Sequence, residues 1–236
     1  MHKTSSKILS IIPARSGSTR VKNKNLRKLG GLPLIYYTIK ASLKSNVTRT
    51  IVSTDDKNIA KIARKFGAEV PFLRPKKFAT PKSSSIAVVL HCLKFLKEKE
   101  NYAPDYVVYL QPTSPFRSFY DINRGLRKIL NSKYNSLVGL SEINQHPYWM
   151  FKKNKHGKID PFLKIKKRPE RSQDLIKLYH INGSLAITRA NFFQTVSGKQ
   201  YILDLKSTIG LEMDPIHSFD IDTEIDFKMA ESFLKN

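Results

Sequence analysis

The sequence predicts an α/β protein whose central sheet is mostly parallel and carries helices on both faces. Short runs of β-branched and aromatic residues alternate along the chain with longer segments whose apolar residues have helical spacing. That alternation is typical of parallel sheets in which helices connect the strands. The length of 236 residues fits one large domain, or one domain with a small appendage. A hydrophobic content of 40% is ordinary for a globular protein and excludes disorder for most of the chain.

In the first half of the chain, prolines, aspartates and a glycine mark where the elements begin and end. Pro13 ends a short apolar run, and Pro33 occupies a favourable first helical position. Asp55 or Asp56 is expected to cap a helix that Gly67 terminates. The expected elements are a strand over 7–12, a helix over 32–44, a strand over 48–54, the helix ending at Gly67, and a helix over 84–99.

The second half continues the alternation and then interrupts it. Residues 106–110 are β-branched and aromatic and are cut off by Gln111-Pro112, so they form the clearest predicted strand. The segment 144–172 is rich in Lys and Arg and has no clean period, which indicates an irregular insertion. The other expected elements are a helix over 119–131, strands over 136–141, 184–188, 209–213 and 217–221, a short helix near 190–196 and a last helix over 223–235.

The charge balance favours anionic partners. The chain has 42 Lys and Arg against 19 Asp and Glu, a net charge of +23, and such a field attracts nucleotides, nucleic acids or acidic small molecules. The single cysteine, Cys92, excludes an internal disulfide and a cysteine-based zinc site. No apolar run reaches the roughly 18 residues of a membrane span, and no secretory signal is recognised. We therefore expect a cytoplasmic protein without membrane contacts.

The loop over 13–25 has the composition of a polyphosphate-binding segment. It combines four cations with several small hydroxyl residues and Gly17. Small residues let backbone N–H groups approach a ligand closely, and the cations neutralise the charge of that ligand. The glycine-rich signatures of P-loop and dinucleotide-binding proteins are absent. From composition alone, a solvated basic loop is an equally good interpretation.

Two further segments carry polar side chains where strands are expected to end, which is where open α/β sheets bind ligands. Asp220 and Asp222 are two residues apart, so on an extended chain both carboxylates point the same way and suit Mg²⁺ with substrate phosphates. Acidic residues are also favoured in the first turn of a helix, which is the simpler interpretation of this pair alone. The residues over 109–117 carry polar groups stiffened by two prolines, or form an ordinary loop between strand and helix.

Several short motifs follow one another over nearly the whole chain. They are Ile12-Pro13-Ala14-Arg15-Ser16-Gly17-Ser18, Lys24-Asn25-Leu26, Ser53-Thr54-Asp55, Arg74-Pro75, Leu110-Gln111-Pro112-Thr113-Ser114-Pro115-Phe116-Arg117, Gln173-Asp174-Leu175, Asn182-Gly183-Ser184 and Asp220-Ile221-Asp222-Thr223. In this order the motifs resemble those of the acylneuraminate cytidylyltransferases. The resemblance implies a Rossmann-like nucleotide-diphospho-sugar transferase fold in a single domain over 1–236. It also implies an inserted arm over 142–182 that forms a homodimer and reaches the partner's active site.

The resemblance further implies an activity and a set of site residues. The family transfers CMP from CTP to the anomeric hydroxyl of a sialic-acid-like 2-keto sugar acid and releases pyrophosphate, with Mg²⁺ as cofactor. Arg15, Lys24 and Asp222 would act in catalysis, and Asp222, or a water or hydroxide on the metal, would take the proton from the attacking hydroxyl. The implied binding residues are Arg15, Ser16, Gly17, Ser18, Lys24 and Asn25 around the nucleotide phosphates, Arg74 and Ser85 at the cytosine or ribose, Gln111, Ser114 and Asn182 at the sugar acid, and Asp220 and Asp222 at the metal.

Three positions depart from the family pattern. Pro81 stands where an Asp is common, and Ser172 and His180 stand where Arg is common. The two missing arginines bear on carboxylate recognition, so legionaminic or pseudaminic acid is as good a candidate as N-acetylneuraminate. Other nucleotidyltransferases, such as the 3-deoxy-octulosonate type, usually have a more glycine-rich opening. The charge favours a nucleic-acid-binding protein, but no helix-turn-helix, RNP, KH or zinc-finger signature supports a specific nucleic-acid partner.

Overall fold

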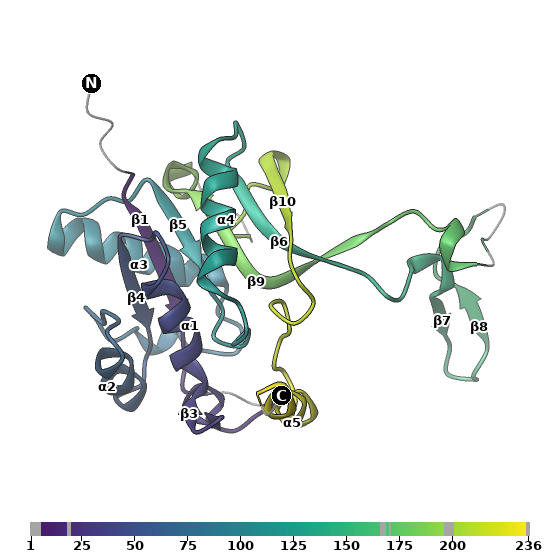
Figure 1. The fold of residues 1–236 in the computed structure, drawn as a ribbon, viewed down its shortest axis with the longest axis horizontal. Helices are drawn as coiled ribbons and strands as arrows, with labels where there is room; N and C mark the ends of the chain where they lie inside the picture. The colour runs from purple at the N-terminus through teal and green to yellow at the C-terminus, as the bar shows by residue number, and fades with distance from the viewer. Residues whose placement is uncertain (1–5, 18–19, 166–168, 170, 196–200, 235–236) are drawn as a thin grey trace.

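The computed structural model describes residues 6–17, 20–165, 169, 171–195 and 201–234. Within these residues, six strands form one sheet in the order β10-β6-β9-β5-β1-β4, and helices cover it in front and behind (Figure 1). The strands are β1 (Ile8–Pro13), β2 (Lys28–Leu29), β3 (Leu32–Pro33), β4 (Arg49–Ser53), β5 (Tyr106–Tyr109), β6 (Ser136–Glu142), β7 (Phe151–Lys153), β8 (Ile159–Pro161), β9 (Tyr179–Arg189) and β10 (Thr208–Glu212). The α-helices are α1 (Leu34–Leu43), α2 (Lys57–Lys65), α3 (Ser85–Glu100), α4 (Phe119–Leu130) and α5 (Glu224–Phe233), and short 3-10 helices cover Lys24–Leu26, Lys76–Phe78, Pro147–Trp149, Ser172–Asp174, Ala190–Thr195 and Leu205–Ser207. In this described part of the chain, none of the helices combines the length and apolar character needed to traverse a bilayer.

The central sheet is mostly parallel, as the sequence predicts. β1 pairs in parallel with β4 and with β5, and β10 pairs in parallel with β6. β9 is the exception, because it lies between β5 and β6 and runs antiparallel to both. It is also longer than the strand expected over 184–188, since its first residues continue outward from the sheet to Tyr179.

The side chains of each strand alternate between two cores, one on each face of the sheet. In β1, Ile8 and Ile12 enter the core that is shared with α1, α2 and α4, whereas Leu9 and Ile11 enter the core that is shared with α3. Because both faces are covered, the central strands are apolar nearly throughout. Cys92 lies fully buried in the α3 core and acts as a small apolar residue there.

The helix expected over 32–44 begins two residues later than predicted. Leu32 and Pro33 form β3, which pairs antiparallel with β2 across a turn that contains Gly30 and Gly31. Both glycines have positive φ, at 55° and 85°, which glycine adopts without strain. Pro33 therefore precedes α1 and does not form its first turn.

The strand expected over 217–221 is wrong. A turn occupies its first part, closed by the N–H of Ser218 on the carbonyl of Asp214 at 3.0 Å. One backbone hydrogen bond, from Ile221 to Thr113 at 2.8 Å, holds its end. Ile221 is fully buried with Leu29 of β2 and Phe227 of α5, so it belongs to the small core beneath α5 and not to the central sheet.

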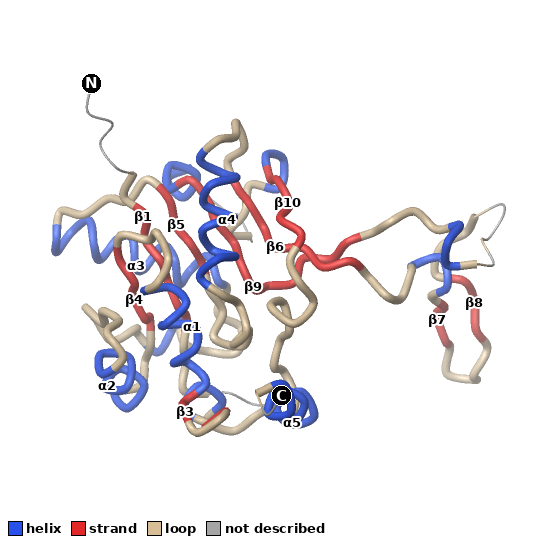
Figure 2. The backbone as a smooth tube through the Cα atoms, in the orientation of Figure 1, coloured by secondary structure: helices blue, strands red, loops and turns tan. Residues whose placement is uncertain are grey.

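The segment expected to be irregular contains a small hairpin that stands away from the sheet (Figures 1 and 2). β7 pairs antiparallel with β8, and the residues of both strands are exposed. The hairpin is joined to the sheet through the outer ends of β6 and β9, which pair as far as Glu142 and Tyr179. The role of this arm in dimerisation stays a prediction.

His91, in α3, makes the stability of the core on the α3 face of the sheet depend on pH. Its ring lies against Phe72 and Phe78, with ring centroids 4.7 and 5.3 Å away. Burial lowers the pKa of His91, and the charges of Arg74 and Lys77 lower it further. The unfolded chain, with a histidine pKa of about 6.5, therefore binds the proton more readily than the folded chain. Stability contributed by the neutral ring is lost as the pH falls below that value.

We expect the Tm of the protein to fall on acidification below about pH 6.5, and His91→Phe to reduce that fall. Phenylalanine keeps an aromatic ring in the packing but cannot take up a proton. Thermal melts across this pH range test the expectation, with His156→Gln in the exposed hairpin as the control. Equal acid sensitivity in His91→Phe and the wild type would contradict it.

Candidate active site

Three parallel strands end side by side at one edge of the sheet. β1 ends at Pro13, β4 ends at Ser53, and β5 ends two residues before Gln111. The basic loop after β1 is tied to the loop after β4, because Ser16 donates to Asp55 from its N–H and from its hydroxyl, at 3.1 and 2.7 Å. The loops that the sequence singled out therefore meet at the carboxyl ends of these strands.

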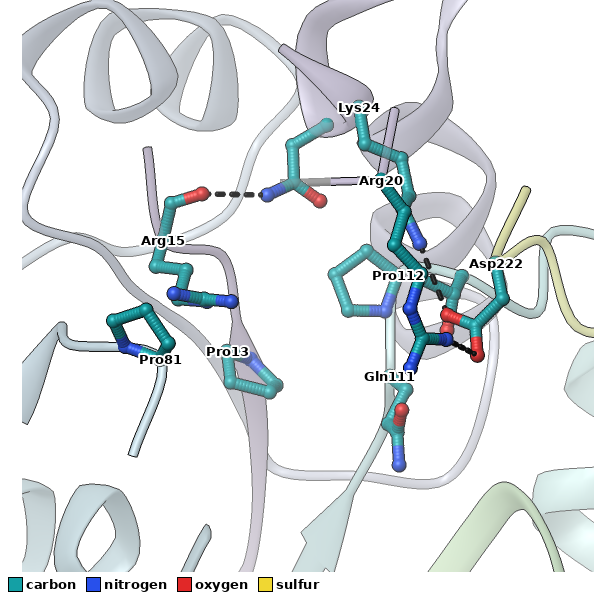
Figure 3. Close-up of a pocket in the computed structure, with 10 residues that line it drawn as sticks. Pro13, Arg15, Arg20, Lys24, Pro81, Gln111, Pro112 and Asp222 are labelled. Carbon is teal, nitrogen blue, oxygen red and sulfur yellow. Dashed lines mark hydrogen bonds and ion pairs between the residues drawn. The ribbon is translucent and has the colours of Figure 1, made fainter. Parts of the chain in front are cut away.

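A cavity of about 450 Å³ lies between these loops (Figure 3). Arg15 lies on one side of it with Pro81, and Arg20, Lys24 and Asp222 lie on the other side (Figure 3). The cavity is lined by Pro13, Arg15, Arg20, Lys24, Asn25, Pro81, Gln111, Pro112, Thr113 and Asp222. The fold thus brings the cation-rich loop and the C-terminal aspartate to one place, although they are far apart in the sequence.

Asp222 pairs with two cations in this cavity. Its carboxylate accepts from Arg20 Nη1 at 2.7 Å and from Lys24 Nζ at 3.2 Å. Lys24 Nζ also donates to the carbonyl of Ile221 at 2.6 Å, and only 10% of the Lys24 side chain is exposed. The Arg20 side chain is 66% exposed. Lys24 is therefore held in place, whereas Arg20 has room to turn toward a ligand.

Arg15 carries hydrogen-bonding capacity that the described residues leave unused. Its Nη1 is buried and has no hydrogen-bond partner among them. Buried donors in native proteins are nearly always paired, so this one indicates a ligand. Pro81 lines the same cavity and offers no side-chain acceptor. An anion such as a phosphate would supply the acceptor that Arg15 lacks.

A second cavity, of about 160 Å³, adjoins the first. Pro13, Arg15 and Pro81 line both. The remaining residues that line it are Arg74, Phe78, Thr80, Ser83, Ser85, Val88 and Tyr109. Burial lowers the pKa of Arg74, whose Nη2 donates to the Ser53 carbonyl at 3.0 Å. A small cavity with several polar side chains, next to a larger one lined with cations, has the layout of a nucleotide site with separate places for base and phosphates.

Asp220 does not line the large cavity, but its carboxyl group interacts with Asp222. Burial raises the pKa of Asp220, and the negative charge of Asp222 raises it further. Two carboxylates that repel each other beside a phosphate-sized cavity form a donor set that fits Mg²⁺. Among the described residues there is no cluster of three or more metal-ligating side chains. A metal ion here would take its other ligands from phosphates and water.

Several residues implied by the resemblance do not line either cavity. The Ser16 side chain is committed to Asp55, and Ser114 is fully buried. Asn182 donates to Ser141 Oγ at 3.1 Å from the neighbouring strand. Gly17 follows Ser16 in the tied loop, and Ser18 lies outside the described residues. The predicted set is therefore split into residues that reach the cavity and residues that surround it.

Five residues that line the large cavity have no site role in the sequence analysis: Pro13, Arg20, Pro81, Pro112 and Thr113. Arg20 belongs to the predicted cation-rich loop, and that composition was the available signal. Pro112 and Thr113 belong to the motif after β5 but carry no charge that would mark them. Their place in the cavity follows from the turn after β5.

Comparison with known proteins decides between the families that share this architecture. A model of the family described as cytidylyltransferase matches residues 9–233. The chain belongs to this family. The cytidylyltransferase is 36% identical over 97% of both chains to the CMP-N,N'-diacetyllegionaminic acid synthase of Legionella pneumophila. It is 34% identical, over 75% of its own length and 76% of the relative's, to the pseudaminic acid cytidylyltransferase of Campylobacter jejuni.

Solved structures support the fold of the cytidylyltransferase. A CMP:2-keto-3-deoxy-manno-octonic acid synthetase in complex with CTP superposes with a TM-score of 0.69, covering 98% of this chain and 99% of the other. At 17% identity, this likeness concerns the fold alone. The family and the nucleotidyltransferase activity that the sequence motifs predict are confirmed.

Proposed function

We propose that the protein transfers CMP from CTP to the anomeric hydroxyl of a nonulosonic acid, a sialic-acid-like 2-keto sugar acid, and releases pyrophosphate. The observation that carries the proposal is the buried Nη1 of Arg15, which has no hydrogen-bond partner among the described residues and lies beside a cavity that Lys24 and Asp222 also line. The sugar class comes from the relatives, whose names specify legionaminic and pseudaminic acids. The more similar of these two relatives makes a legionaminic acid the first candidate. We assign the reaction to the cytoplasm, where CTP is made.

Cations around the large cavity would bind the triphosphate and stabilise the charge that develops during transfer. Phosphoryl transfer depends mainly on positioning and electrostatic stabilisation, so preorganised cations are effective. Lys24 is already anchored and needs no rearrangement. Arg20 would leave Asp222 for the phosphates when CTP binds, which frees a carboxylate oxygen.

In the reaction, the anomeric oxygen forms a bond to the α-phosphorus while the bond from that phosphorus to the pyrophosphate oxygen breaks. Asp222 would accept the proton of the attacking hydroxyl through the oxygen that Arg20 releases. Arg15 and Arg20 would neutralise the leaving pyrophosphate. The residues of the second cavity, Arg74 and Ser85 among them, would hold the cytosine or the ribose.

We also propose that Asp220 and Asp222 hold Mg²⁺ together with the substrate phosphates. Support comes from the mutual repulsion of the two carboxylates, which a divalent cation relieves. When bound, the ion neutralises charge on the phosphate oxygens. The positions of Lys24 and Arg15 do not depend on it.

Nucleotide binding gives the first test. We expect CTP, at about 100 times its dissociation constant with Mg²⁺, to add ~2.7 kcal/mol to the stability of the fold. For a chain of this size that raises the Tm by about 5–10 °C. UTP, ATP and GTP serve as controls at 0.15 M salt, roughly the physiological ionic strength. Equal shifts with all four nucleotides would indicate non-specific anion binding on a basic surface and would contradict the proposal.

Pyrophosphate release gives the decisive test. The purified protein is incubated with CTP, Mg²⁺ and one of four acids: N,N'-diacetyllegionaminic, pseudaminic or N-acetylneuraminic acid, or 3-deoxy-octulosonate. We expect the highest kcat/KM with the legionaminic acid. Turnover with 3-deoxy-octulosonate alone would assign the protein to a different sugar-acid class, and no turnover with any acid would overturn the function.

We further propose that the arm over 142–182 forms a homodimer. Large apolar side chains gather on it although they are exposed in the single chain, among them Met150, Ile159, Phe162 and Leu163. Apolar groups on a projecting hairpin gain stability when a second copy covers them.

We expect Ile159→Glu combined with Phe162→Glu to convert the dimer to a monomer, because two charges would be buried in the contact. Light scattering after size-exclusion chromatography measures the mass. Lys155→Glu in the same hairpin is the matched control, since it changes charge without changing the apolar surface. A wild-type protein that is monomeric at micromolar concentration would contradict the proposal.

A further inference from the structure

Gln111 and Ser184 face each other just beyond the last bonded pair of β5 and β9. The antiparallel register runs from Tyr106 opposite Arg189 to Tyr109 opposite Ala186. Two more steps in the same register set Gln111 opposite Ser184. On the other side of β9, the pairing with β6 is irregular between Val138 and Leu140. This part of β9 is therefore held less by strand pairing than the rest.

The guanidinium of Arg117 takes over where the strand pairing stops. Its Nη1 donates to the carbonyl of Ser184 at 2.6 Å and to the carbonyl of Gln111 at 3.3 Å. Its Nη2 donates to Thr38 Oγ1, in α1, at 2.8 Å. One side chain thus connects the end of β5, the irregular part of β9 and a helix that covers the sheet.

Burial makes these contacts costly, which argues against an incidental placement. Arg117 is 2% exposed, and burial lowers the pKa of its guanidinium to about 9. The negative charge of Asp121 acts on Arg117 and partly offsets this lowering of the pKa. The Asp121 carboxylate is already bonded by Ser118 and His217. Among the described residues, Arg117 forms no ion pair and its Nε has no hydrogen-bond partner. Two carbonyls and one hydroxyl therefore compensate a fully buried charge.

The two carbonyls belong to the backbone beside the residues assigned to the sugar acid. Gln111 lines the large cavity. The N–H of Ser184 donates to Asn182 Oδ1 at 3.0 Å, so the backbone of Ser184 orients the Asn182 amide. Between them, a Cβ added to Gly183 would come within 3.2 Å of Gln111 Nε2, which shows how closely the Gln111 amide lies over this turn of β9.

We propose that Arg117 is a positioning residue that fixes the spacing of Gln111 and Asn182, and thereby the binding of the sugar acid, without touching substrate. The proposal rests on the proposed function for the identity of the ligand. Without the guanidinium, the two carbonyl oxygens would lose the donor that they share, because the longer bond of 3.4 Å from Thr38 Oγ1 reaches the Gln111 carbonyl alone. They would move apart, and the Gln111 and Asn182 amides would move with them. On the CTP side of the cavity, the described residues of the loop after β1 bond Ser53, Asp55, Ile221 and Asp222, and not Arg117 or the two carbonyls that it holds.

Arg117→Lys tests the proposal, because lysine keeps the charge but has a single ammonium in place of two rigidly linked nitrogens, of which Nη1 bonds both carbonyls and Nη2 bonds Thr38. We expect kcat/KM for the sugar acid to fall by about 10–10²-fold, since small misplacements of binding groups have effects of that size. The KM for CTP should stay within about twofold of the wild type. Thr38→Val, which removes the Nη2 acceptor and the 3.4 Å bond from Thr38 Oγ1 to the Gln111 carbonyl, should act in the same direction and more weakly.

Arg49→Lys is the matched control. Arg49 also sits largely buried in the sheet and bonds Glu69 and Glu100, but it lies away from the cavities. We expect it to lower stability without changing either KM. If Arg117→Lys lowers the Tm as Arg49→Lys does and leaves both KM values unchanged, Arg117 is only structural and the proposal is overturned. Equal losses for CTP and for the sugar acid would overturn it as well.

A readout without turnover separates this proposal from the proposed function. The side-chain amide NMR signals of Gln111 and Asn182, in the free protein, report their surroundings directly. We expect both to shift in Arg117→Lys and in Thr38→Val, but not in Arg49→Lys. Unchanged signals would overturn the positioning role even in an active enzyme. Shifted signals in a protein that turns over none of the sugar acids would uphold it and overturn only the proposed function.

Discussion

Replacing Lys24 by alanine is expected to lower kcat/KM for CTP by about 10²–10³-fold, equivalent to ~3–4 kcal/mol of transition-state stabilisation. The ammonium is preorganised, with bonds of 2.6 Å to the Ile221 carbonyl and 3.2 Å to Asp222. Its side chain is only 10% exposed, so water cannot easily take its place. Steady-state kinetics with CTP and the preferred sugar acid, read by pyrophosphate release, measures the loss.

Lys22→Ala is the matched control for this prediction. Lys22 belongs to the same loop and carries the same charge, but it is exposed and does not line the cavity. We expect its effect on kcat/KM to stay within about threefold, as for other screened surface charges. Comparable losses in both variants would mean that the loop acts through its net charge and that the position of Lys24 has no special role.

The second large effect is expected from Asp222→Asn, which should lower kcat by about 10²–10³-fold while the protein stays folded. The amide has the shape of the carboxylate, but it can neither accept the proton of the attacking hydroxyl nor pair with two cations. Melting curves establish folding, and single-turnover rates isolate the chemical step. Glu224→Gln is the control. Glu224 lies two residues beyond Asp222, pairs with Arg27 and does not line the cavity.

The double variant Lys24→Ala with Asp222→Asn refines both expectations. Groups that act as one unit lose little more activity when both are removed than when one is removed. We expect the kcat/KM of the double variant to be close to that of the less active single variant. Fully additive losses would mean that Lys24 and Asp222 work independently, and near-wild-type turnover of either single variant would contradict its assigned role.

Much of the fold was predictable because its signals are local. The strands β1, β4 and β5 were predicted to within one or two residues, since apolar runs and breakers such as Pro13 and Pro112 mark them. The direction of β9 was not predictable, because periodicity reports burial and says nothing of which neighbour a strand pairs with. The false strand over 217–221 has a similar origin, since Phe219 and Ile221 are apolar like strand residues but pack against α5 and not in a sheet.

The site was predictable where composition carries the signal and unpredictable where the partner is remote. Arg15 and Lys24 lie in a segment that is rich in cations and small residues, and Asp222 lies two residues after Asp220. The pairing of Arg20 with Asp222 joins residues 202 positions apart, which only the folded chain brings together. Arg117 ends the motif over 110–117, but its burial and its contacts with remote carbonyls were not predictable, because a buried arginine looks in the sequence like an exposed one.

The central place of β9 also has consequences for how the chain folds. β5 and β6 are neighbours only through β9, and the arm lies between β6 and β9 in the sequence. Until the residues of β9 are available, β5 and β6 therefore expose unbonded edges, which are templates for pairing with other chains. Closing the sheet requires distant contacts, so it is expected to be a slow step in folding. A newly made chain should consequently be most prone to aggregation after β6 emerges from the ribosome and before β9 does.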